Sequence, residues 1–312
     1  MARTFLSYAL ALGVMAYLSY GLPLWLPGDF ATAMYASSDV VLSPQEEARL
    51  TPVPPSFLAY VDAFMRGDFG LSLAYGVPIS TLLGEALPWT LLLGLCAYLS
   101  SFAVAFVLGV ESAFRRASKV DRRLSGAMVS LDGVPELVLG VVFLLFFGAH
   151  LGWFPLQGAL TPYSDKSGIA HVADVLAHLC LPAMTLFLAS LSGQFLLVRV
   201  SVLHVLPAPF VSCAHLRGIG PWRVRYKYVA LNALLPIVVR FGFRLASMVT
   251  SLIVVETIFA YPGIGSLLMD AVAKRDVPVI QVVVTLLSLG VVGMSVLLEG
   301  VAFWLKPKGN RA

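Results

Sequence analysis

The sequence predicts an all-α protein that crosses a lipid bilayer six times. Of its 312 residues, 59% are hydrophobic and only 12% are charged, whereas soluble domains carry about 25% charged residues. The chain has too little charge to cover a surface that faces water. This composition excludes an ordinary soluble enzyme and a disordered tail. The three cysteines show no paired spacing, which also argues against a disulfide or zinc framework.

Six segments are apolar enough to be membrane spans, since a bilayer core needs roughly 20 apolar residues in a helix. Four of them contain no charged residue, and these are 5–26, 88–110, 175–198 and 277–298. The segments 126–150 and 236–259 also qualify but carry charges, namely Asp132, Glu136, Arg240, Arg244 and Glu256. The apolar core of 5–26 is longer than the roughly 7–15 residues of a signal peptide, so we expect it to remain as a helix.

The basic residues predict the orientation of the chain. Fourteen of the 21 lysines and arginines lie at Arg3, in 111–125, in 199–227 and in the tail, and five lie in the opposite segments. The positive-inside rule therefore predicts that both termini are cytoplasmic. The chain then divides into a first helix (1–26), an external capping segment (27–87), a five-helix core (88–305) and a cytoplasmic tail (306–312). The net charge of +4 is explained by the basic residues that set this orientation. We therefore expect contacts with lipid and no nucleic-acid partner.

One cytoplasmic stretch, about 201–235, is organised beyond its charge. Pro207 and Pro209 end the fourth span, and Gly218 and Pro221 separate a first short helix from a second. Two amphipathic helices at the membrane surface are expected, where they would bind lipid headgroups or a partner protein. A basic loop that only sets the topology is the alternative. The sequence shows no phosphate-binding glycine loop, no metal-binding motif and no nucleophile elbow, so the chain is predicted not to be an enzyme.

The same stretch resembles the EAA loop of ABC importer permeases, through Ala214-x-x-x-Gly218 and the sequence from Asn232 to Pro236. Ser212 and Cys213 replace the usual glutamate and alanine, as is common in the dipeptide, oligopeptide and nickel branch. Further segments resemble that branch in order along the chain, namely 26–29, 67–72, 151–155, 256–265 and 275–281.

The resemblance implies a type I ABC importer permease fold and transport by alternating access. It implies a second homologous permease, two ATPases that bind ATP and Mg²⁺, and an extracytoplasmic binding protein, with no cofactor or metal held by this chain. The cargo would be short peptides or a chelated metal such as nickel. In the family the loop docks on the ATPase, which assigns Ser212, Cys213, Ala214, Arg217, Gly218, Asn232 and Pro236 to coupling. A homodimeric permease stays open as an alternative.

The charges within the spans are candidate pathway or gate residues. Asp132 and Glu136 are four apart, as are Arg240 and Arg244, and like charges at that spacing repel. We therefore expect an ion cluster between the third and fifth spans, with contact to the substrate as the alternative. Glu256 is either functional or a hydrogen-bonding group at a helix end.

The segment from Pro262 to Gly263 is expected to form a sharp turn at the external end of the path. A proton-coupled secondary transporter that uses the intramembrane carboxylates is the rival functional class. However, no inverted repeat supports it.

Overall fold

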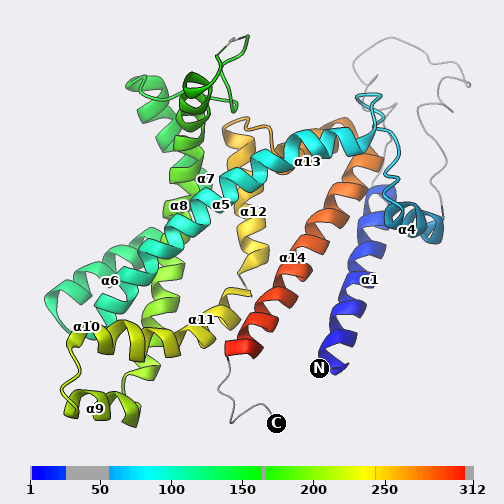
Figure 1. Cartoon of the computed structure of the whole chain (residues 1–312). Helices are drawn as coiled ribbons and strands as arrows, with labels where there is room; N and C mark the ends of the chain where they lie inside the picture. Colours follow the sequence, from blue (N-terminus) through cyan, green and yellow to red (C-terminus); the bar gives the residue numbers. More distant parts are fainter. Residues whose placement is uncertain (1, 26–55, 164–165, 243, 306–312) are drawn as a thin grey trace, which may run out of the picture. The chain divides into compact units, whose positions relative to one another are not determined.

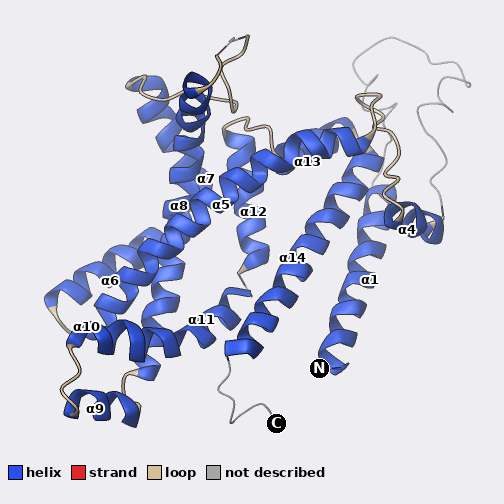
Figure 2. Ribbon diagram, in the orientation of Figure 1, coloured by secondary structure: helices blue, strands red, loops and turns tan. Residues whose placement is uncertain are grey.

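The computed structural model describes residues 2–25, 56–163, 166–242 and 244–305, and it is helical nearly throughout (Figures 1 and 2). Within these residues the extended backbone is limited to one bridge between Leu71 and Pro78. The segment from Leu26 to Asp29, which resembles a family motif, lies outside the described residues, as does the tail 306–312. The predicted all-α fold is confirmed.

Four helices are long and apolar enough to cross a membrane: α1 (Ala2–Trp25), α5 (Ile79–Phe114), α8 (Ile169–Val205) and α14 (Val277–Leu305). Two bent helix pairs qualify when each is taken as one span. The first joins α6 (Lys119–Asp132) to α7 (Glu136–Phe143) and the π-helix η1 (Leu144–His150). The second joins α10 (Pro221–Arg223), η2 (Val224–Ala230) and α11 (Leu231–Gly242) to α12 (Leu245–Ile258). These six correspond to the six predicted spans. Shorter helices are α4 (Phe57–Met65), α9 (Pro209–Leu216) and α13 (Ile264–Lys274).

The third span is not the continuous helix that we expected. Its chain bends by 91° between α6 and α7, across Gly133, Val134 and Pro135. Pro135 has no N–H to donate to the preceding turn, so it ends α6 and stands directly before the first turn of α7. Asp132 therefore ends one helix and Glu136 begins another. The prediction that they share one helical face is wrong.

The fifth span also differs from the prediction, because its helix does not begin at Pro236. One helix runs from Pro221 to Gly242 with Pro236 inside it, and α12 starts at Leu245. Proline is tolerated inside a membrane helix when neighbouring groups satisfy the freed backbone. Consequently the second part of the cytoplasmic stretch and the start of the fifth span form a single helix, instead of two elements separated by a proline.

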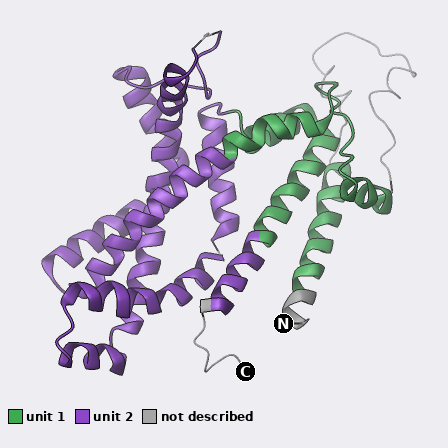
Figure 3. Cartoon of the chain, in the orientation of Figure 1, with its two compact units in different colours: residues 1–90, 262–293 green, residues 91–261, 294–312 purple. Residues whose placement is uncertain are grey.

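The chain forms two compact units (Figure 3), of which unit 1 comprises residues 1–90 and 262–293. Its apolar core includes Ile79, Ile264 and Val283. Beside this core, Ser72 Oγ donates to Asp276 Oδ2 at 2.5 Å, and the backbone N–H of Ala74 donates to the same oxygen at 3.0 Å. The segments 67–72 and 275–281, both singled out by the resemblance, are thus joined through a buried carboxylate.

Unit 2 comprises residues 91–261 and 294–312 and contains the bent pairs, α8 and α9 (Figure 3). Within it α8 lies close against α5 at Gly109. A Cβ atom on Gly109 would lie 2.8 Å from Cγ1 of Val198 and 3.1 Å from the backbone N of Arg199. The missing side chain at Gly109 is therefore what allows the two helices to pack at this distance.

Replacing Gly109 with alanine should destabilise unit 2 by about 1–3 kcal/mol, the usual cost of an overpacked contact. The measurement is the apparent Tm of the purified protein in detergent. Gly126→Ala in α6 is the matched control, because a Cβ there meets no atom within 4 Å and alanine favours a helix. A Tm for Gly109→Ala equal to that of Gly126→Ala would contradict this account of the packing.

Candidate functional site

The short helix α9 is closed at both ends by the residues that the sequence singled out. Pro209 occupies its first turn, where a missing N–H costs nothing. Gly218 lies just beyond its end with a φ of 69°, and the N–H of Ile219 donates to the carbonyl of Ala214 at 3.2 Å. This pattern is a Schellman cap, which needs a left-handed residue and favours glycine. The expectation that Gly218 supplies the permissive backbone is confirmed.

One face of α9 is anchored inside the protein and the other is free. Val211 and Ala214 are buried, with Ala214 only 2% exposed, in a core that also contains Val198 and Val202 of α8. Val224 of η2 belongs to the same core. Ala214, which the resemblance assigns to coupling, therefore packs its small side chain within this chain. The exposed residues of α9 and its end are Pro209, Phe210, Ser212, Cys213, His215, Leu216, Arg217 and Gly218.

The helix that follows, from Pro221 to Gly242, packs against α9 and is called the supporting helix (Figure 1). Val229, Ala233 and Ile237 continue the core that holds α9. Asn232, assigned to coupling by resemblance, is exposed, and its Nδ2 donates to the carbonyl of Tyr228 at 2.5 Å. Pro236 is half-buried within α11. Both residues thus shape the supporting helix and lie outside α9.

An ion pair joins this supporting helix to the end of α5. Arg225 Nη1 lies 2.7 Å from Oε2 and 3.0 Å from Oε1 of Glu111. The guanidinium also stacks over the ring of Phe114, with 5.4 Å from its carbon to the ring centroid. Tyr226 adds a hydroxyl hydrogen bond to Oε1 at 3.3 Å. The supporting helix is therefore held to α5 by charge as well as by apolar packing.

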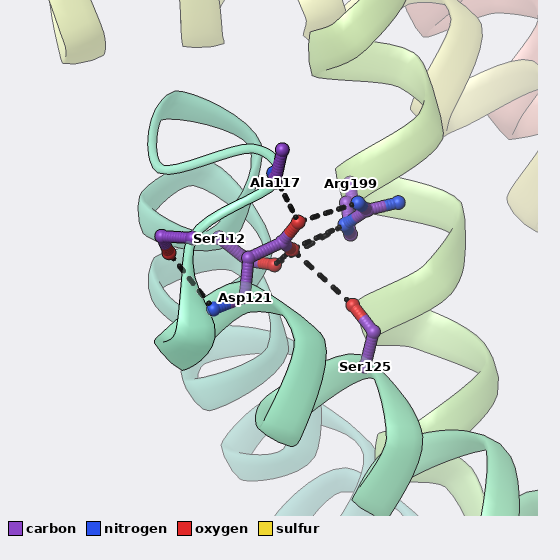
Figure 4. Close-up of polar contacts among 6 residues, drawn as sticks. Ser112, Ala117, Asp121, Ser125 and Arg199 are labelled. Atoms are coloured by element: carbon purple, nitrogen blue, oxygen red, sulfur yellow. Dashed lines mark hydrogen bonds and ion pairs between the residues drawn. The ribbon is translucent and has the colours of Figure 1, made fainter.

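A second ion pair ties α5, α6 and α8 together (Figure 4). Asp121, 4% exposed, receives Nε and Nη2 of Arg199, each at 2.9 Å. Its oxygens also accept the hydroxyl of Ser112 at 2.5 Å, the backbone N–H of Ala117 at 3.1 Å and the hydroxyl of Ser125 at 3.3 Å. Charge-assisted bonds of this number and geometry can offset the cost of burying a carboxylate.

Sequence reasoning missed the acidic halves of both pairs. The segment 111–125 was interpreted only through its five basic residues, which set the orientation. Glu111 and Asp121 are the two acids within it, and both hold arginines from later in the chain. The two acids in a segment otherwise rich in cations were the available signal, because the positive-inside rule depends on lysine and arginine and gives no reason for acids there.

The predicted ion cluster between the third and fifth spans does not form. Among the described residues, neither Asp132 nor Glu136 makes an ion pair with Arg240 or Arg244. Instead each carboxylate accepts a serine hydroxyl, from Ser192 at 2.8 Å for Asp132 and from Ser251 at 3.1 Å for Glu136. The bend at Pro135 separates the acids onto two helices, and the end of α11 at Gly242 separates the arginines in the same way.

Glu256 and the Pro262–Gly263 segment lie at the end of α12. Glu256 is fully buried, and its backbone carbonyl accepts the N–H of Tyr261 at 2.8 Å. Ala260, with a φ of 44°, occupies the left-handed position of this turn. Gly263 has φ −100° and ψ −178°, an extended conformation open to any residue. The prediction that glycine at 263 makes the turn is therefore wrong, because Ala260 makes it.

Metal ligation finds no support in the described part of the chain, where no group of three or more His, Cys, Asp or Glu side chains could hold an ion. The geometry instead presents a short helix with one anchored face and one free face. Such an element is suited to contact with another molecule.

Reversing the charge of either Glu111 or Arg225 should lower the apparent Tm of the purified protein, because each change places like charges in contact. The double exchange, Glu111→Arg with Arg225→Glu, should recover part of that loss, on the order of 1 kcal/mol for a half-buried pair. Asp62 and Arg66, an exposed pair in unit 1, provide the matched exchange and should change little. Additive losses at Glu111 and Arg225, with no recovery, would show that the pair does not hold the helix.

The sequence of this chain matches a known protein family. Residues 105–310 match the model of the family described as binding-protein-dependent transport system inner membrane component. The matched region begins within α5 and extends through α14, so it includes Glu111, Asp121 and the whole of α9.

Individual relatives agree along most of the chain. A probable peptide ABC transporter permease protein of Sinorhizobium fredii is 33% identical, over 84% of this chain and 83% of its own length. The oligopeptide transport system permease protein AppB of Bacillus subtilis is 31% identical, over 89% and 88%. The dipeptide transport system permease protein DppB of Escherichia coli K12 is 27% identical, over 88% and 87%. The chain therefore belongs to the family of binding-protein-dependent transport system inner membrane components.

Proposed function

We propose that this chain is the membrane-spanning permease subunit of an ATP-driven importer of short peptides. The printed names of its relatives support peptides as the cargo, in preference to the chelated nickel that the resemblance also allowed. The observation that carries the coupling role is the free face of α9, presented by a helix whose opposite face is locked into unit 2.

In this proposal the chain supplies part of the transport path and hydrolyses nothing. Two ATPase subunits bind ATP and Mg²⁺, and a second, homologous permease completes the path. An extracytoplasmic binding protein delivers the peptide. Closure of the ATPases moves α9, and the supporting helix packed against it passes that motion to α5 through the Glu111–Arg225 pair. The path then alternates between outward and inward openings. Both termini and α9 lie on the cytoplasmic side, as the basic residues predict.

The energy source separates this proposal from a proton-coupled transporter. Peptide uptake should continue when a protonophore collapses the proton gradient while ATP is maintained, and it should stop when ATP is removed. The measurement is uptake of labelled tri-alanine into cells or proteoliposomes that hold the whole complex, together with recovery of an ATPase on purification. Uptake that follows the proton gradient, with no ATPase recovered, would favour the rival class, for which Asp132, Glu136, Glu256 and Glu299 are the candidate proton carriers.

Docking of α9 can be tested at its most exposed apolar side chain. Leu216 is 88% exposed, so Leu216→Glu should leave the fold intact. It should nevertheless reduce recovery of the ATPase and peptide uptake at least tenfold, because a charge would be buried against the partner. Ile169, at the start of α8, is 89% exposed, and Ile169→Glu is the matched control. Equal, small effects of the two substitutions would argue against docking through α9.

A further inference from the structure

We infer that a polar pocket of unit 2 binds the C-terminal carboxylate of a peptide in transit, and that Arg244 is the residue that receives it. This inference rests on the proposed import of peptides and adds a binding site within the path. The pocket lies among α5, α8 and α12, all in unit 2, and its lining includes Tyr98, Ser190, Arg244, Ser247 and Ser251.

The chemistry of the lining is unusual for a membrane protein. Lipid-facing surfaces are apolar, yet three serines, a tyrosine and an arginine converge on one hollow. The cavity volume is about 70 Å³, smaller than the roughly 300–1,000 Å³ of sites that enclose a whole small molecule. A single water needs about 10–15 Å³ of such space, so the pocket has room for a carboxylate group, with the rest of the peptide outside it.

Arg244 is the group in this lining with unused donors. A guanidinium carries five N–H groups, and among the described residues those of Arg244 donate to no protein acceptor and form no ion pair. The hydroxyls are already used: Tyr98 donates to the carbonyl of Met248 at 2.5 Å, and Ser247 to the carbonyl of Arg244 at 2.8 Å. An arginine within a span needs polar or anionic partners, and the exposed side chain of Arg244 is open to an anion.

The nearby acids are kept away from Arg244. Glu136 is held by Ser251, which itself lines the pocket, and Asp132 is held by Ser192. Had either carboxylate paired with Arg244, the positive charge would be neutralised and no carboxylate of a substrate could compete for it. The serine bonds therefore leave Arg244 without a direct ion pair. A free C-terminal carboxylate, which peptides of every sequence share, can supply that pair.

The backbone of α8 makes room for this guanidinium. A Cβ atom on Gly193 would lie 1.7 Å from Nη1 and 2.7 Å from Cζ of Arg244. The absent side chain at Gly193 is thus a notch in which the arginine head rests. This notch offers a way to displace the charge without removing it, because Gly193→Ala would force the guanidinium out of its place.

The experiment compares two probes that differ only at the C-terminus, tri-alanine and its C-terminal amide. Uptake of each is measured in proteoliposomes that hold the whole complex, its binding protein and ATP. Each variant is expressed as a ratio to wild type for the same probe, so that the preference of the binding protein cancels. Arg244→Met should reduce uptake of tri-alanine at least tenfold and uptake of the amide less than twofold. Gly193→Ala should reproduce this selectivity although the arginine is still present.

Two substitutions provide matched controls. Arg123→Met removes an exposed arginine of α6 that does not line the pocket, and Gly126→Ala adds a methyl group in open space. Both should leave the two uptake ratios within twofold of wild type. ATP hydrolysis stimulated by the binding protein, measured on every variant, reports whether the complex is assembled.

The outcomes separate the inference from the proposed function. Equal losses for both probes in Arg244→Met would overturn the inference and assign the arginine to folding or to a lipid phosphate. No loss for either probe would overturn it as well. If the wild-type complex takes up neither probe, the proposed import of peptides fails and the inference falls with it. Loss confined to the free acid, in both Arg244→Met and Gly193→Ala, supports the site.

Discussion

The ion pair between Asp121 and Arg199 is the interaction on which unit 2 depends. Asp121 accepts hydrogen bonds from the end of α5, the turn that follows it and α6, and its ion pair joins these groups to the last two turns of α8. The core that seats α9 is built on the same two long helices, through Val110 of α5 and Val202 of α8. A partly buried arginine without its carboxylate would be strongly destabilising. The position of α9 therefore follows from a contact well inside the bundle.

Helix α9 has one face buried in the core of unit 2 and one face exposed, and different side chains account for the two. The anchored face is apolar and small, so it packs closely against α8 and η2. The free face carries side chains that are exposed, among them Phe210, Leu216 and Arg217. An element that passes force between two proteins needs both, since a loosely held helix would absorb the motion. The ion pair between Arg225 and Glu111 adds a charged contact between the supporting helix and α5.

Hydropathy and charge were sufficient to predict the class of fold, the six spans and the position of the loop. They were not sufficient to predict where the spans break. Pro135 and Pro236 both lie within predicted membrane spans. Pro135 nevertheless separates two helices, whereas Pro236 lies within one. The outcome depends on whether neighbouring helices satisfy the backbone, which is tertiary information. The charges show the same limit: their spacing suggested mutual pairing, but the serines that hold Asp132 and Glu136 come from distant helices. Glu111 and Asp121 were overlooked because counting cations ignores acids.

The division of α9 into two faces has a consequence for how such importers diversify. Substitutions at Val211 or Ala214 affect the stability of this chain. Those at Ser212, Cys213 or Leu216 affect the binding of whichever molecule contacts the free face. Partner choice can therefore drift, or be redesigned, through a handful of outward side chains without disturbing the bundle. Under the proposed docking, grafting those side chains between related permeases would change which ATPase binds while the transported cargo stays the same.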